Sequence, residues 1–388
     1  MFRAEKLLRN VTRGSNCWNR VQIRRKTQDV FAWKMDGASK DIPFIVVQSP
    51  YTVKIQPVNP MEVIENVDTD GQSVKGNVYL ETDDEGDLAP DLKNSFLKDI
   101  EFNVRPVSSN SKDYLEVTCT EQQQFQYPSR NITVHFQVPA TCGVDVKVRG
   151  DASIEVKDLE GGPFQMVTNQ GTCYLKNLKG SSLKALSSNG GIICQSQLLF
   201  EHGFLETKKK GNISVKKLQG KEFYLKTEHG DVNVGATYLI KAKLASESGC
   251  INLGDVHGFT EIHVEEGNIS IGSTSGQLEA FTGRGSIDVN LSQHEDVKLN
   301  TKEGDITIKC LQESFSSEFL VKSNHIHVDS NINVVIDEER AEGNQTVMAG
   351  KLNKQDKGEE QIKMINAEAK LGTVKFEKED WFTSLKLS

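Results

Sequence analysis

Carboxylates are the first side chains in this chain that could support catalysis. Asp231, Asp288 and Asp305 lie in short β-like stretches, and paired carboxylates act as acid and base in enzymes that cleave polysaccharides. Those enzymes need carboxylates clustered on one exposed strand. These three are separated along the chain and do not share one position of its repeat. We interpret them as corner or solvent-facing residues, and the sequence predicts no catalytic residue.

Two histidines form the best candidate for metal chemistry. His325 and His327 flank Ile326, so both should project from the same face of a strand. Such a pair can ligate a transition metal when a third ligand is nearby, and His263 and Asp329 are candidates. Nothing in the sequence places either beside the pair. We predict no metal and no cofactor, since HExxH, P-loop and dinucleotide motifs are also absent from the sequence.

A cluster of seven lysines near the middle of the chain is the candidate binding site. Three lie together before a glycine and the others belong to the adjoining repeat. The cluster could contact an unknown protein or an anionic membrane surface, for example cardiolipin headgroups. Alternatively, its members are solvated side chains that protect β-structure from edge pairing. The residues are Lys208, Lys209, Lys210, Lys216, Lys217, Lys221 and Lys226.

These side chains must be positioned by a repeat of about 19 residues, because glycines recur 18 to 21 residues apart. The glycines are Gly150, Gly171, Gly190, Gly211, Gly230, Gly249, Gly267, Gly285 and Gly304. The second and fourth residues after each glycine are usually apolar, as in GNISV (211–215) and GDITI (304–308). This alternation predicts a strand with one buried face. A second short strand precedes each glycine, with Thr or Ser usually three residues before it.

A repeat of this length is too short for its own core, so the units must stack on one another. We predict an all-β fold, a β-solenoid resembling a parallel β-helix, in which equivalent apolar residues lie in register from coil to coil. An antiparallel β-sandwich is the alternative, but its strands would show a less regular register. The predicted ladder is Ile213, Val232, Ile251, Ile269, Ile287 and Ile306.

Charge is distributed unevenly along the 388 residues, whose formal net charge is −8. Residues 1–26 contain eight Lys or Arg and a single acid, Glu5. An Arg-rich, acid-poor leader is typical of a mitochondrial presequence, although it could also be a basic segment with no targeting role. The remaining chain is acidic, which argues against nucleic-acid binding. No apolar run approaches the roughly 20 residues of a membrane span.

The pattern divides the chain into five predicted segments. Residues 1–29 are a mitochondrial targeting presequence, 30–139 an irregular β-rich region, 140–334 the β-solenoid repeats, 335–361 a charged flexible loop, and 362–388 a final coil and cap. The last segment regains the repeat around Gly372, and Trp381 and Phe382 would cover the open end.

These motifs resemble a known family. The stretch VPATCGVDVKVRG (138–150) and the repeated Thr-x-x-Gly-Asp-Ile-x-Ile and Leu-x-Gly elements are similar to the putative-adhesin β-repeat family, over about residues 130–330. With its leader and its DWFTSLKL ending, the whole chain also resembles the animal "family with sequence similarity 185". The resemblance implies a β-solenoid and a mitochondrial location, and it brings no catalytic residues.

We therefore expect a non-enzymatic β-solenoid scaffold or binding protein whose partner is unknown. The competing hypothesis is a carbohydrate-active or other enzyme that uses one face of a parallel β-helix. Seven cysteines show no CxxC motif or regular pairing. A reduced interior location would favour free thiols over a disulfide.

Overall fold

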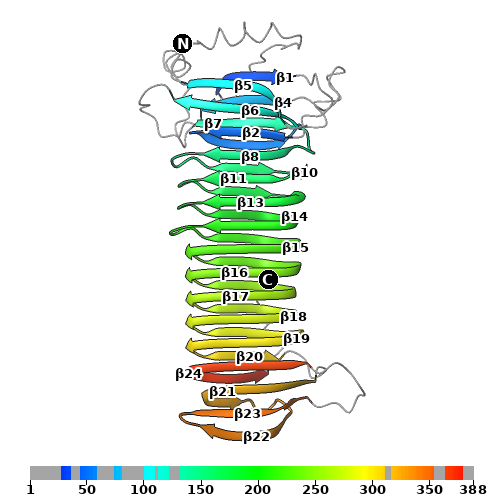
Figure 1. Cartoon of the computed structure of the whole chain (residues 1–388), viewed down its shortest axis with the longest axis vertical. Coiled ribbons are helices and arrows are strands. Elements are labelled where there is room, and N and C mark those ends of the chain that lie inside the picture. Colours follow the sequence, from blue (N-terminus) through cyan, green and yellow to red (C-terminus); the bar gives the residue numbers. More distant parts are fainter. Residues whose placement is uncertain are drawn as a thin grey trace. The chain divides into compact units, whose positions relative to one another are not determined.

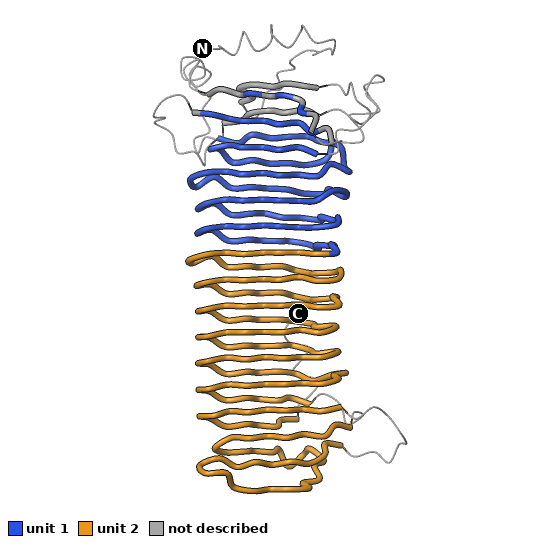
Figure 2. The backbone as a smooth tube through the Cα atoms, in the orientation of Figure 1, with its two compact units in different colours: residues 1–201 blue, residues 202–388 orange. Residues whose placement is uncertain are grey.

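The structure is a computed structural model that describes residues 28–35, 44–58, 74–80, 100–109, 112–121, 132–310, 316–353 and 363–378. All regular elements of these residues are β-strands, and none is a helix. The chain divides into two compact units, residues 1–201 and 202–388 (Figure 2). Each unit is a stack of β-coils with parallel register, so the fold is a β-solenoid and the alternative of an antiparallel sandwich is wrong.

Unit 1 contains the first thirteen strands and most of the fourteenth. They are β1 (Gln28–Met35), β2 (Phe44–Ser49), β3 (Thr52–Pro57), β4 (Val74–Leu80), β5 (Ile100–Ser109), β6 (Lys112–Glu121), β7 (Ile132–Val138), β8 (Gly143–Val148), β9 (Ile154–Lys157), β10 (Glu160–Gly161), β11 (Phe164–Thr168), β12 (Cys173–Lys176), β13 (Leu178–Ser187) and β14 (Ile192–Thr207).

The coil formed by β2 and β3 lies out of sequence order in unit 1. Strand β2 pairs in parallel with both β6 and β8, and β3 pairs in parallel with both β7 and β9. The coils β6–β7 and β8–β9 follow each other along the chain, so the earlier coil is inserted between them. Beyond the β6–β7 coil the pairing becomes antiparallel, since β5 pairs with β6, β4 with β7 and β1 with β4, which ends the repetitive stack. The described part of region 30–139 therefore includes two solenoid coils.

The strands of unit 2 that follow β14 are β15 (Ile213–His229), β16 (Val232–Ser248), β17 (Ile251–Glu266), β18 (Ile269–Arg284), β19 (Ile287–Glu303), β20 (Ile306–Cys310), β21 (Ser317–Val328), β22 (Val334–Glu342), β23 (Gln345–Leu352) and β24 (Met364–Lys378). Of these, β15 to β19 and β24 are long and each follows most of a coil, whereas the others are shorter. Figure 1 shows β15 to β19 as successive rungs of one stack.

Each coil of unit 2 consists of two arms joined by a bend. In β15, side chains of the first arm (213–216) and the second arm (222–228) alternate between the interior and solvent, and residues 217–221 form the bend. The buried residues of equivalent positions pair directly: Ile213 with Val232, and Val232 with Ile251. The same register continues through Ile269, Ile287 and Ile306, so the predicted ladder is confirmed.

The repeated glycine is required because successive corners of the coil lie in close contact. A Cβ atom on Gly249 would lie 2.3 Å from the carbonyl oxygen of Gly230, and Gly249 has a φ of +149°. Such a φ is strained for any residue with a side chain. Behind the corner, buried hydroxyls satisfy the carbonyls: Thr227 Oγ1 donates to Gly230 O at 2.8 Å. The Thr or Ser before each glycine therefore has a structural role.

Strand β24 is also inserted out of sequence order, as Figure 1 shows. Its first half pairs in parallel with β19 and its second half with β20, while β21 pairs along its opposite edge. The final coil predicted around Gly372 is thus present, but it lies between β20 and β21 and does not end the stack. The predicted cap residues Trp381 and Phe382 lie outside the described residues.

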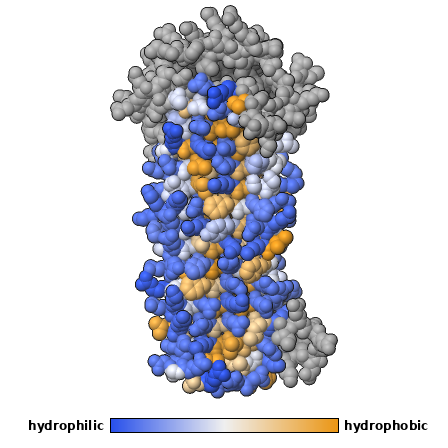
Figure 3. All heavy atoms as spheres, in the orientation of Figure 1, coloured by the Kyte–Doolittle hydropathy of each residue, from blue (hydrophilic) through white to orange (hydrophobic). Residues whose placement is uncertain are grey.

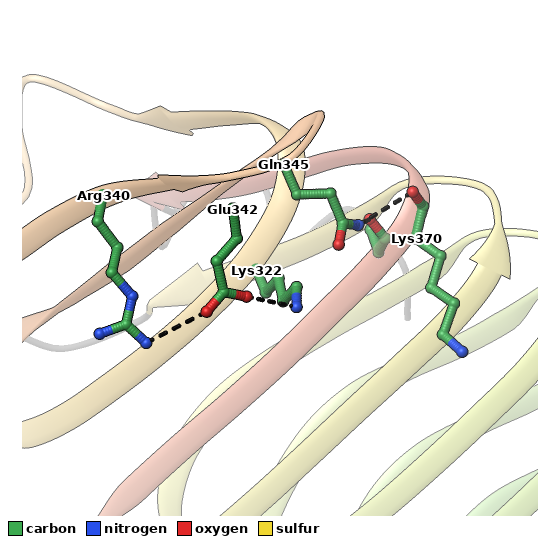
Figure 4. A network of polar contacts seen from close by, with 6 residues as sticks. Lys322, Arg340, Glu342, Gln345 and Lys370 are labelled. Carbon is green, nitrogen blue, oxygen red and sulfur yellow. Dashed lines mark hydrogen bonds and ion pairs between the residues drawn. The ribbon is translucent and has the colours of Figure 1, made fainter.

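The prediction of a flexible loop at 335–361 is wrong for its first part. Residues 334–352 form the antiparallel hairpin β22–β23, and β23 pairs with β21. The hairpin forms because Gly343, with a φ of +62°, allows a tight turn, and because Val347, Met348 and Leu352 are buried. Polar contacts also attach it: Glu342 pairs with Lys322 at 2.7 Å, and Gln345 donates to Lys370 O (Figure 4).

The predicted presequence is not placed by the structure. Residues 1–27 lie outside the described residues, and residues 28 and 29 belong to β1. No helix of the described residues is long and apolar enough to span a membrane.

Candidate functional site

On the outer surface of unit 2, side chains that follow the corner glycines accept hydrogen bonds from the backbone of the equivalent residue in the next coil. Immediately after the corner glycine, Asn212 Oδ1 accepts the Asp231 N–H at 2.9 Å, and Asp231 Oδ1 accepts the Cys250 N–H at 2.8 Å. Asp305 Oδ1 likewise accepts the Thr373 N–H of the inserted β24 at 2.9 Å. This ladder explains why Asn and Asp follow the glycines so often.

The second arms carry charged and aromatic pairs between neighbouring coils. Lys243 pairs with Glu261 at 2.8 Å, and the partly exposed rings of His263 and Phe281 stack with centroids 4.7 Å apart. Hydrophilic side chains cover most of the face seen in Figure 3, with hydrophobic side chains in a narrower strip within each unit. The solvent-facing side chains are therefore held in fixed rows.

The candidate carboxylates do not come together. Asp231 and Asp305 occupy the same position after a corner glycine but are several coils apart, and Asp288 occupies a different position, so the three do not share one coil position. Asp288 lies two residues further along its own coil and pairs with Lys309 at 2.8 Å. Each carboxylate accepts a bond from an adjacent coil, which is a structural use.

The two histidines of β21 project outward as predicted, and both are exposed. Their partners on β24 are Thr373 and Lys375. His263 lies on the second arm of β17, where its Nε2 contacts Glu265 at 2.9 Å, and it does not join the pair. No group of three His, Cys, Asp or Glu within the described ranges could hold a metal ion.

The seven lysines surround one coil and do not form a single patch. Residues 208–210 are exposed at the glycine corner, whereas Lys226 lies on the second arm of β15. Lys216 ends the first arm, and Lys217 and Lys221 lie on the bend. Of the seven, Lys216, Lys217 and Lys221 lie on or next to the same bend.

Next to these three lysines the structure places apolar residues that the sequence analysis missed. Tyr238 on the neighbouring bend is 42% exposed, and Lys217 Nζ lies 4.8 Å from the centroid of its ring. His257 of the next coil stacks on Tyr238 with centroids 4.5 Å apart. Ile240, two residues further along β16, is 70% exposed. The signal available in the sequence was a bulky apolar residue, Ile240, on a bend between the two alternating arms of its coil.

A scan against protein families matches residues 91–368 to the model described as Toastrack DUF4097. The chain belongs to the Toastrack DUF4097 family.

Two solved structures resemble this Toastrack chain at low identity. One is a putative cell adhesion protein from Clostridium sporogenes. Its sequence is 10% identical, the alignment covers 90% of this chain and 99% of that chain, and the TM-score is 0.21. The other is a putative adhesin from Bacteroides fragilis, with 13% identity, 75% of this chain and all of that chain covered, and a TM-score of 0.33.

The described cysteines of this Toastrack chain are free thiols. Cys173 and Cys194 occupy inward positions of the ladder and are buried, as the alternation indicated. Burial raises the pKa of the Cys173 thiol to about 12, so it stays protonated and behaves as a small apolar side chain. Cys250, at an outward position, is the half-buried one among those described.

Proposed function

We propose that the protein is a non-enzymatic scaffold that binds a partner through the outer surface of its coils. The observation that carries this proposal is that outward-facing side chains are held in place by contacts with the neighbouring coil. Asn212 and Asp231 bond to the following coil, and Tyr238 is held between Lys217 and His257. Side chains that are already ordered lose little conformational entropy when a partner binds, so a rigid surface binds more tightly than a mobile one.

Membership of the Toastrack DUF4097 family supports this proposal at the level of the fold. We further propose that the scaffold works in mitochondria, because residues 1–26 form an Arg-rich, acid-poor leader. The resemblance to the animal "family with sequence similarity 185" supports the same location. Fusing residues 1–35 to a fluorescent reporter tests it: we expect mitochondrial import, and a diffuse or secreted reporter would contradict it.

Proximity labelling in cells tests the binding role itself. The full chain is fused to a labelling enzyme, and residues 1–35 fused to the same enzyme serve as the control for location. We expect a reproducible set of neighbours with the full chain that the leader alone does not label. Identical sets from the two fusions would count against a binding scaffold.

A further inference from the structure

The bend of β16 projects apolar side chains into solvent beside lysines. Ile240 is 70% and Tyr238 42% exposed, and both belong to one turn of backbone. Phe259, on the equivalent bend of β17, is partly exposed and lies under Lys241, whose Nζ is 5.5 Å from the ring centroid. A single exposed apolar side chain is common, but here three bulky apolar side chains are exposed or partly exposed on two neighbouring bends.

A bulge produces this projection. Tyr238 pairs with His257 and Lys241 pairs with Phe259, so β16 has one residue more than β17 between these pairs. The shorter bend contains Gly258, whose φ is +84° and whose missing Cβ would lie 1.9 Å from Leu239 O. A bulge of this kind turns the extra residue away from the ladder. Ile240 is therefore held outward by backbone geometry.

The bulge lies in a locally basic part of an acidic protein. The three neighbouring bends with their flanking residues, 216–222, 235–241 and 254–259, contain four lysines and two acids, whereas the whole chain has a net charge of −8. Lys221 stands opposite Ile240 in the register between β15 and β16, since Gly220 pairs with Leu239 and Glu222 with Lys241. Lys221 thus lies beside Ile240 in the neighbouring coil, and Lys241 follows Ile240 in the chain.

We propose that this bend surface, formed by Lys217, Lys221, Tyr238, Ile240, Lys241 and Phe259, docks on a lipid bilayer that contains anionic headgroups. The inference rests on the proposed function, because it names the partner class of the binding scaffold. A projecting aliphatic side chain can enter the soft headgroup–acyl boundary, where tyrosine is also favoured. Lysines bury their aliphatic stems and keep their ammonium groups at the phosphates.

Vesicle flotation with the purified full chain tests the proposal. The probes are vesicles of phosphatidylcholine with about 30% phosphatidylserine, and vesicles of phosphatidylcholine alone. We expect binding to the anionic vesicles and about tenfold weaker binding by Ile240→Ser. The matched control is Leu371→Ser, because Leu371 is 63% exposed elsewhere in unit 2, beside Lys370. Equal losses from the two substitutions would overturn the proposal.

Charge and depth of insertion are tested separately. Lys217→Gln and Lys221→Gln should each weaken binding about fivefold, whereas Lys370→Gln should not. In an Ile240→Trp variant, the indole emission should shift to the blue on anionic vesicles, whereas Leu371→Trp should show no such shift. Binding that is insensitive to the lysines or to Ile240 would show that another surface is responsible.

The two proposals fail in different ways. If the full chain does not bind anionic vesicles, while proximity labelling still detects proteins that the leader control does not label, the bilayer inference is wrong and the scaffold proposal stands. If Ile240→Ser abolishes the labelling of a protein neighbour and the wild-type chain does not bind vesicles, the bend surface binds protein and the bilayer inference is equally wrong. If neither vesicles nor specific neighbours are found, both proposals are wrong.

Discussion

Single side chains in the ladder decide whether neighbouring coils stack. Val232 is fully buried between Ile213 and Ile251, whereas Asn233, one residue along, points outward. Val232→Asp should therefore cost several kcal/mol of unfolding free energy, because it buries a carboxylate without a partner. Asn233→Asp should cost far less. Denaturant unfolding of both variants measures the difference, and equal losses would contradict the register.

Buried hydroxyls offer a second contrast, in which the same substitution should have opposite effects. Thr227 Oγ1 donates to Gly230 O, whereas the hydroxyl of Thr237 is buried without a hydrogen-bond partner in the described structure. Thr227→Val should destabilise the protein by about 1 kcal/mol, and Thr237→Val should be neutral or stabilising by about the same amount. In thermal unfolding, Thr227→Val should melt at a lower temperature than the wild-type chain, and Thr237→Val at the same or a higher temperature.

A buried histidine should make the stability of unit 2 depend on pH. His294 is fully buried and contacts Ser317 Oγ at 2.8 Å through Nε2, and burial, with a smaller contribution from Lys363, lowers its pKa to about 4. The unfolded chain binds a proton near pH 6.5, so between pH 6.5 and 4 it holds more protons than the folded chain. Stability should therefore fall by up to about 3 kcal/mol as the pH decreases through this window.

The measurement is denaturant unfolding at neutral pH and near pH 4.5, with His294→Gln as the comparison. Glutamine keeps a hydrogen-bonding group toward Ser317 but does not titrate. The variant should lose less stability than the unchanged chain on acidification. An identical pH dependence in both would show that His294 does not contribute to it.

At the scale of elements, the regular coils could be predicted because each repeats the same physical requirements. Gly249 allows the close contact at the corner, Thr227 donates a hydrogen bond to a corner carbonyl, and Val232 fills the interior. These requirements fix both the residue type and the spacing. The ladder, the outward direction of His325 and His327, and the return of the repeat at Gly372 follow from this alternation.

The elements that were mispredicted depend on contacts between distant segments. The charged residues of β22 obscured the hairpin, although buried Met348 and Leu352 and the turn at Gly343 define it. Nothing local to β24 indicates that it lies between β20 and β21. The bend surface was missed because the bulge at Ile240 arises from the unequal lengths of two neighbouring coils.

At the scale of the whole molecule, each unit contains one coil that is inserted between coils consecutive along the chain. In unit 1 this coil is β2–β3, and in unit 2 it is β24. An inserted coil pairs along both of its edges, so it cannot leave without opening hydrogen bonds on two sides. It also joins segments far apart in sequence, which is expected to slow folding.

Removing β24 should therefore damage unit 2 more than removing the hairpin. Strand β24 buries Ile365, Ala367, Ala369, Val374 and Phe376, and its loss leaves a gap of one coil between β20 and β21. Truncation after residue 362 should lower the melting temperature strongly and cause aggregation through the exposed strand edges. Deletion of residues 334–352 uncovers only one arm of β21 and should have a smaller effect.

A peptide of residues 363–388 offers the decisive control, because it can supply the missing coil in trans. It should bind the truncated chain through two strand edges, prevent the aggregation and restore most of the lost melting temperature. A peptide in which Val374 and Phe376 are replaced by Ser should fail, because these side chains are fully buried in the ladder. A truncated chain that remains monomeric with an unchanged melting temperature would show that the insertion of β24 does not hold unit 2 together.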